Sequence, residues 1–261
     1  MTIVFHEIRQ NWQTCLLWTA SIALLLTMCI FLYPEMEGEV AGLNLMFSSM
    51  GSFTKAFGMD QLDIGSFAGF YAVECGTILG LGGAFFACLT GASMLAKEEC
   101  GRTAEFLLSH PVSRRKIVIK KFMALMMQII VMNGVLFLTA AADIAGIGEA
   151  IPWTDLLLIH VSSLLMQIEL GAICFAVSAF LSGNSAGLAM GMALTAYFLN
   201  LAANISDKAA FLKNITPFGY SDAADVVSEG QLNTPLLLLG LILSAACLLL
   251  ACFRYAKKDI H

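Results

Sequence analysis

Long apolar runs constrain this chain more than any other feature of its sequence. Six runs each contain enough residues to cross about 30 Å of hydrocarbon as an α-helix. They cover residues 14–33, 70–95, 122–142, 156–180, 186–203 and 235–253. Such continuous runs predict helices rather than barrel strands, whose apolar residues alternate. Because 59% of the 261 residues are hydrophobic and 13% are charged, we predict an all-α membrane protein whose single domain, residues 1–261, spans the bilayer six times.

The positively charged residues predict an orientation. If the N-terminus lies inside, the inner segments hold all but three of the 14 Lys and Arg residues. The inner residues are Arg9, Lys97, Arg102, Arg114, Arg115, Lys116, Lys120, Lys121, Arg254, Lys257 and Lys258, and the outer ones are Lys55, Lys208 and Lys213. Because inner loops carry the excess of positive charge, both termini are predicted to be cytoplasmic. The basic patch lies between two apolar runs, so we expect no nucleic-acid partner.

Three segments outside the spans carry further expectations. Residues 1–12 mix apolar and charged side chains, which predicts a short interfacial helix along the inner surface, with a frayed terminus as the alternative. The outer loop 34–69 begins acidic and then becomes apolar, which favours short amphipathic helices. The segment 205–234 is predicted to be a second outer loop. None of the eight cysteines lies in a CxxC pair, so we interpret them as apolar fillers and expect no metal site.

Polar residues inside the spans form a separate group of candidates. Glu169 lies deep in the fourth span, and Asn133 lies at a similar depth in the third, which makes it a candidate partner. An intramembrane carboxylate is a functional candidate by default. It could line a substrate path or act as protonated structural glue, and the sequence leaves both open. Glu74 and His160 lie near the outer ends of their spans, where interfacial placement is favoured over a gate pair.

The inner loop between the second and third spans is the most informative stretch of the sequence. Residues 98–108 can form about three helical turns, which Pro111 would end. Ser113 is a plausible N-cap for the helix that becomes the third span. Residues 106–108 form an apolar knob that is too short to span and too apolar for bare solvent. The loop therefore predicts a contact between a helix and a groove, with a plain loop anchored to lipid headgroups as the alternative.

This loop resembles the cytoplasmic loop of type-2 ABC transporter permeases. The shared pattern is Glu-Glu-x-Gly-x-Thr-x-Glu-Phe-Leu-Leu-Ser-x-Pro-Val-Ser-Arg. The matching residues are Glu98, Glu99, Gly101, Thr103, Glu105, Phe106, Leu107, Leu108, Ser109, Pro111, Val112, Ser113 and Arg114. A weaker match is residues 212–222, which are similar to the Thr-Pro-Phe segment before the family's sixth span. The resemblance covers nearly the whole chain in the number, order and spacing of the spans.

The resemblance implies a transport subunit, the permease of an exporter, in a bacterial cytoplasmic membrane. Residues 98–110 would be a coupling helix that sits in a groove of a separate ABC ATP-binding subunit. That subunit would hold ATP and Mg, and this chain would hold no cofactor. A second permease copy is also implied, either identical or a related paralogue, with the first and fifth spans at the interface. Small residues at helical spacing support close helix contacts. They are Gly76, Gly80, Ala84, Cys88 and Ala92 on the second span, and Gly183, Gly187 and Gly191 at the fifth.

Two sequence motifs bear on catalysis. The sequence contains no Gly-x4-Gly-Lys-Ser/Thr phosphate loop, so ATP hydrolysis is expected in a partner chain and this chain is not expected to be an enzyme. The alternative is a self-sufficient six-span carrier or an intramembrane enzyme. Residues 183–187 match Gly-x-Ser-x-Gly, but His160 is expected near the opposite face from Ser185, which disfavours a serine protease.

Overall fold

The computed structural model describes residues 2–37, 51–100, 113–181, 183 and 185–258, and all the regular elements in these ranges are helical. Six helical segments are long and apolar enough to cross a membrane. They are Ile3–Met36, Phe67–Lys97, Arg114–Gly146, Trp153–Ser178, Ala186–Ile205 and Thr234–Lys257. The predicted all-helical fold with six candidate spans is therefore confirmed. The predicted spans fall within or close to these segments, most of which extend further at their ends.

The spanning helices and their connections follow the chain in simple order. The spans are α1 (Thr2–Glu37), α4 (Phe67–Phe70) continued by a π-helical turn η1 (Tyr71–Cys75) and α5 (Gly76–Cys100), α7 (Arg114–Gly146), α8 (Trp153–Ser178), α9 (Ala186–Ile205) and α11 (Thr234–Lys257). The short elements are α3 (Ser52–Ala56), the 3-10 helices η2 (Asp207–Asn214) and η3 (Pro217–Tyr220), and α10 (Ala223–Glu229). The short helix α3 lies in the loop 34–69, where short helices were expected, whereas η2, η3 and α10 lie in the segment 205–234, for which no helix was predicted.

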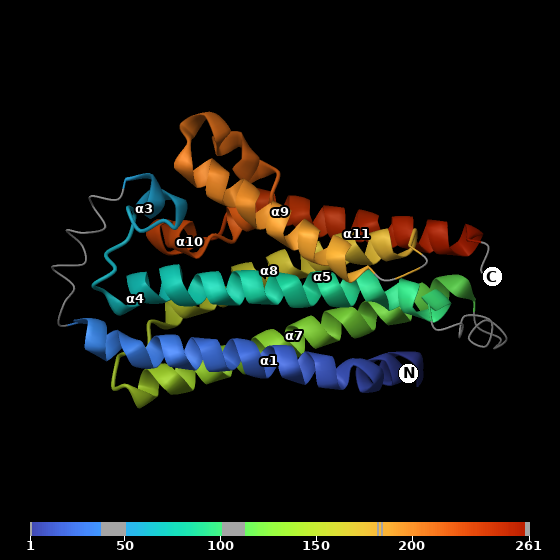
Figure 1. The fold of residues 1–261 in the computed structure, drawn as a ribbon, viewed down its shortest axis with the longest axis horizontal. Helices are drawn as coiled ribbons and strands as arrows, with labels where there is room; N and C mark the ends of the chain where they lie inside the picture. Colours follow the sequence, from blue (N-terminus) through green and yellow to red (C-terminus); the bar gives the residue numbers. More distant parts are fainter. Residues whose placement is uncertain (1, 38–50, 101–112, 182, 184, 259–261) are drawn as a thin grey trace.

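The long helices run side by side along the longest axis of the molecule, and both chain ends lie at the same end of the bundle (Figure 1). The short helices α3 and α10 lie at the opposite end (Figure 1). The spans through α5 and α8 are central, since 67% and 61% of their most apolar windows are buried, against 17% for α1 and 22% for both α9 and α11. The two central helices therefore organise the bundle, and α1, α9 and α11 expose most of their length.

Small residues let the two central helices approach closely. A Cβ atom added at Gly91 of α5 would lie 2.5 Å from the backbone oxygen of Gly171 on α8. A Cβ atom at Gly83 would collide with the side chain of Gln167. The predicted small-residue ladder of the second span faces inward, because Ala84 and Cys88 are fully buried among residues of α8 and α9. This ladder therefore serves contacts within the chain.

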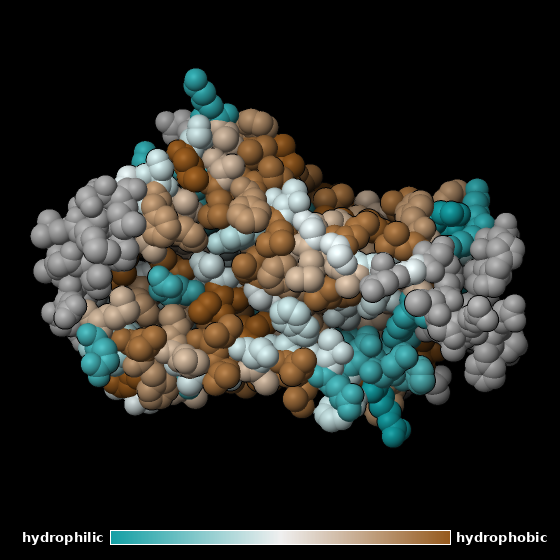
Figure 2. All heavy atoms as spheres, in the orientation of Figure 1, coloured by the Kyte–Doolittle hydropathy of each residue, from teal (hydrophilic) through white to brown (hydrophobic). Residues whose placement is uncertain are grey.

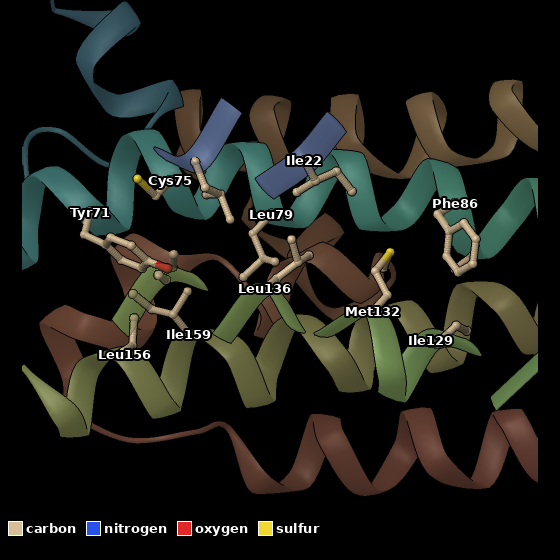
Figure 3. Packing of buried hydrophobic residues seen from close by; sticks show 14 of the residues in the cluster. Ile22, Tyr71, Cys75, Leu79, Phe86, Ile129, Met132, Leu136, Leu156 and Ile159 are labelled. Atoms are coloured by element: carbon tan, nitrogen blue, oxygen red, sulfur yellow. The ribbon is translucent and has the colours of Figure 1, made fainter. Parts of the chain in front are cut away.

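The apolar core lies between α1, the second span, α7 and α8, where their side chains interdigitate (Figure 3). Its labelled members include Ile22, Leu79, Met132 and Ile159. On the face that Figure 2 shows, apolar residues predominate along the middle of the bundle. Several leucines of the spans, such as Leu138 on α7, are more than half exposed. Because exposing so much apolar surface to water is unfavourable, this surface is suited to contact with lipid tails.

The prediction of a separate interfacial helix at the N-terminus is wrong. The first residues are part of α1, a single α-helix from Thr2 to Glu37 without a break before the span. No glycine or proline lies near Trp12 to allow a turn there. In addition, Glu7 is buried in ion pairs with lysines of α5 and α7, which hold the first turns of α1 against the bundle.

The Gly91 contact generates a stability prediction. The Gly91→Ala substitution should lower the stability of the purified protein by about 1–3 kcal/mol, because the added methyl group overlaps the backbone of α8. Gly134→Ala on α7 is the matched control, since nothing lies within 4 Å of its added Cβ. Thermal unfolding in detergent measures both variants. Equal melting temperatures for the two variants would contradict the prediction.

Candidate functional site

Most of the predicted coupling loop lies outside the described residues. The helix α5 continues through Glu98 and Glu99 to Cys100, and the chain is described again from Ser113. Residues 101–112, which include the apolar knob, are not described, so the coupling helix stays a prediction. Arg114 is placed as the first residue of α7, where its guanidinium donates to the Lys258 backbone oxygen at 2.6 Å.

A buried ion cluster lies beside the ends of this loop. The Glu7 carboxylate of α1 accepts from Lys97 Nζ of α5 at 2.5 Å and from Lys121 Nζ of α7 at 2.7 Å. Lys121 is fully buried and also donates to the Met94 backbone oxygen at 3.0 Å. Hydrophilic residues gather on the surface near the N-terminal end of α1 (Figure 2). One carboxylate thus joins three helices, and removing one partner of such a buried pair typically costs about 3–5 kcal/mol.

Sequence reasoning missed this cluster. From the sequence, Lys97 and Lys121 indicate only the orientation of the spans, and Glu7 is predicted to lie in an interfacial helix. The sequence does contain a signal for it. Glu7 lies just before the first predicted span, and Lys97 and Lys121 lie at the ends of the second and third spans that are predicted to be on the same side, so the three residues are expected at one depth. Opposite charges at one depth favour pairing, because an unpaired charge is costly there.

Glu169 is buried at mid-depth, as predicted, but its partner is not the predicted one. Tyr220 Oη donates to Glu169 Oε2 at 2.6 Å. A Cβ atom at Gly240 of α11 would lie 2.3 Å from the same oxygen, so this carboxylate is enclosed between α8, η3 and α11. Asn133 instead donates to Gln167 Oε1 at 2.7 Å. Glu169 and Gln167 are two residues apart and therefore face different sides of α8, so the proposed Glu169–Asn133 pairing is wrong.

The segment after α9 returns into the bundle. Thr216 Oγ1 donates to the backbone oxygen of Ala196, which lies about halfway along α9, at 2.7 Å. The Phe218 ring meets the Tyr197 ring of α9 in a T-shaped contact with 5.5 Å between centroids. Together with the Tyr220–Glu169 bond, these contacts place η3 well below the tip of α9. The sequence predicted a simple outer loop here, so the return of the chain was missed.

Asp222 fixes the junction between this segment and α9. Its carboxylate caps α10 by accepting from the Ala224 amide, and it accepts from the side-chain amides of Asn200 and Asn204 at 2.8 and 2.9 Å. Burial, and then the nearby Asp225 carboxylate, raise the pKa of Asp222 above its usual value. A polar cavity of about 40 Å³ lies beside it between α5, α9 and η3. That volume suits a water molecule or two.

Glu74 and His160 do not form a pair. His160 is 4% exposed, and its Nε2 atom lies 2.8 Å from Tyr71 Oη. Its ring also meets Phe137 edge to face. The Glu74 side chain is exposed. The favoured interfacial placement therefore fits Glu74 and not His160, which belongs to the packing between the second span, α7 and α8.

An apolar groove of about 400 Å³ runs along the exposed side of α9. Leu170 of α8, Gly191 and Thr195 of α9, and Pro217 of η3 are among its lining residues. Cβ atoms added at Gly187 and Gly191 would meet nothing within 4 Å. The glycines predicted for helix contacts at the fifth span therefore face away from the other helices of this chain.

These features define a class: a six-helix membrane protein with a paired carboxylate at mid-depth and a buried ion cluster at one end. The comparison with protein families is more specific. The family described as ABC-2 family transporter protein matches residues 1–260, and the chain belongs to that family. No curated protein is similar enough to this chain to give a match. The resemblance to type-2 ABC permeases is thus confirmed, and the chain is a membrane component of the ABC transporter type.

The Glu169–Tyr220 bond generates a second prediction. Tyr220→Phe removes the donor to Glu169 and should lower stability by about 1–3 kcal/mol, because a buried acceptor loses its partner. Tyr197→Phe is the matched control, since the Tyr197 hydroxyl makes no hydrogen bond with any described residue. Chemical or thermal unfolding in detergent measures the difference. A Tyr220→Phe protein as stable as the control would show that the bond does not hold η3 in place.

Proposed function

We propose that this chain is the permease subunit of an ATP-driven ABC exporter, powered by a separate ATP-binding subunit. The observation that carries the proposal is membership of the ABC-2 transporter family over residues 1–260, with six candidate spans. These 261 residues contain no phosphate-binding loop, which supports a separate ATP-binding subunit as the energy source. ATP and Mg belong to that partner, and this chain needs no cofactor of its own.

The partner ATPase binds at residues 98–110. An apolar knob flanked by charged residues suits a helix-in-groove contact. The segment also joins α5 to α7, so a force on it would act on a central helix of the bundle. The contact residues in this proposal are Glu98, Glu99, Gly101, Thr103, Glu105, Phe106, Leu107, Leu108, Ser109, Pro111 and Arg114.

The transporter works as a dimer of permease chains in a bacterial cytoplasmic membrane, with both termini inside. The shared location of the chain ends and the distribution of Lys and Arg support this orientation (Figure 1). The open glycine face of α9 and the low burial of α1 support an interface along these helices, with an identical copy or a paralogue.

The substrate path includes Glu169 and Asn133, which lie at a similar depth on different sides of α8. Both lie at mid-bilayer depth, and η3 closes over Glu169 through Tyr220. A substrate leaving toward the outside would have to displace this returning segment, which gives the transporter an element that can alternate between closed and open states. Export is the direction that such an outer closure suits.

The partner contact generates a third prediction. The double substitution Phe106→Asp and Leu107→Asp should abolish co-purification with a chain that carries a phosphate loop and hydrolyses ATP, because two charges replace the apolar contact. Phe106→Leu with Leu107→Met is the matched control and should retain the partner. Pull-down from native membranes in mild detergent, with ATPase assays and mass spectrometry, measures both. Full transport by this chain alone in liposomes without ATP would instead favour a self-sufficient carrier or intramembrane enzyme.

The substrate path generates a fourth prediction. Glu169→Gln keeps the size of the side chain and its bond to Tyr220, but removes its ability to carry charge. If Glu169 contacts substrate, the substrate-stimulated ATPase rate of the assembled transporter should fall about tenfold or more, which corresponds to about 1.4 kcal/mol. Asn133→Asp tests the other residue of the proposed path in the same assay. A wild-type rate in Glu169→Gln would assign Glu169 a purely structural role.

A further inference from the structure

The helix α1 contacts the rest of the bundle through different interactions at its two ends. Of the six candidate spans its apolar window is the least buried. Its apolar side chains, such as Ile22 and Leu26, pack into the core mainly along α7. Toward the outer end, Thr27 Oγ1 donates to Asp143 Oδ2 of α7 at 2.6 Å, and the Tyr33 hydroxyl donates to the Gly65 backbone oxygen at 3.0 Å. At the inner end the ion cluster of Glu7 fastens it to both α5 and α7.

The two lysines of this cluster are not equivalent. Lys121 is fully buried and holds Glu7 against α7, with a second bond to the backbone of α5. Lys97 is 19% exposed, and its Nζ atom donates to two side chains of α1: to Glu7, and to Gln10 Oε1 at 2.8 Å. Glu7 and Gln10 are three residues apart and lie on one face of α1. Two bonds to one helix face fix position more firmly than one, so Lys97 clamps the first turns of α1 to the end of α5.

Lys97 lies directly before the proposed ATPase-binding segment. It lies in the last turn of α5, three residues before Cys100, where α5 ends. Glu98 and Glu99, the first residues of the proposed ATPase-binding segment, follow it directly. A displacement of that segment must therefore pass through the turn that carries Lys97 before it reaches the bundle.

We propose that Lys97 is a positioning residue that makes the inner part of α1 move with the inner end of α5 when the ATPase acts on the loop. This inference rests on the proposed function. Without Lys97, the first turns of α1 keep the buried Glu7–Lys121 pair but lose both side-chain bonds to the last turn of α5, so they no longer follow the movement of that turn directly. Because α1 is proposed to contact the second permease copy, the clamp would carry the movement of the loop to that interface.

The test uses the assembled transporter and needs no knowledge of the substrate. Hydrogen exchange of the amides in residues 2–15 is measured with and without ATP plus vanadate, which traps the partner ATPase. In the wild-type complex we expect trapping to change the exchange of this segment by about threefold or more. Lys97→Met should abolish that change while the exchange of α5 still responds. Lys97→Arg, which keeps two charge-assisted bonds within reach, should restore it.

Lys116→Met is the matched control, because it removes an exposed inner lysine from α7 that takes no part in the cluster. Its α1 segment should respond like wild type. Melting temperatures check folding, and Lys97→Gln, which keeps a hydrogen-bond donor, replaces Lys97→Met if that protein does not purify.

The outcomes separate this inference from the proposed function. A wild-type chain that binds no ATPase would overturn the proposed function. A complex that forms and hydrolyses ATP, but in which α1 of Lys97→Met still responds like wild type, would overturn the role of Lys97 alone. A response lost equally in Lys116→Met would show that only net charge matters, which also overturns it.

Discussion

The close contact between α5 and α8 is the constraint on which the rest of the structure depends. Gly91 and Gly171 let the two backbones meet where a side chain would keep them apart. In a bilayer, helices gain little from hiding apolar surface from lipid, so tight packing and internal hydrogen bonds must hold them together. The central pair supplies the packing. The remaining helices are arranged around it, with α1 and α7 on one side and α9 and α11 on the other (Figure 1).

Polar side chains then fix the outer helices to this centre. Glu7 joins three helices at the end of the bundle that holds both termini, Asn133 meets Gln167 between α7 and α8, and Tyr220 meets Glu169 between η3 and α8. Each bond lies where water is scarce, so leaving either partner alone would be costly. Under the proposed function, the Glu7 cluster lies at the end of the bundle where an ATPase would act, and the Tyr220–Glu169 bond holds the segment that would have to open. The proposed transport cycle therefore depends on the groups that stabilise the fold.

Predictions from the sequence were correct where the composition of a segment determines its structure. They were wrong where contacts with a distant part of the chain determine it. The span of α8 was predictable because its hydrophobicity alone excludes it from water. The straight start of α1 was not, because Glu7 is held by lysines about 90 and 114 residues further along the chain. Asn133 was assigned to the wrong partner for the same reason: depth along a helix can be counted, but the face that meets a neighbour depends on packing. His160, expected at the interface, is buried by Tyr71.

By itself, the sequence determined that this chain spans a membrane with six helices, that positive charge gathers at one end of them, and that it resembles ABC transporter permeases. These properties follow from local composition and from the cost of placing polar groups in hydrocarbon. Tertiary structure alone decided that the segment after α9 returns toward Glu169, and that one carboxylate at position 7 joins three helices. Both depend on side chains far apart in sequence meeting at one depth, which no local pattern encodes.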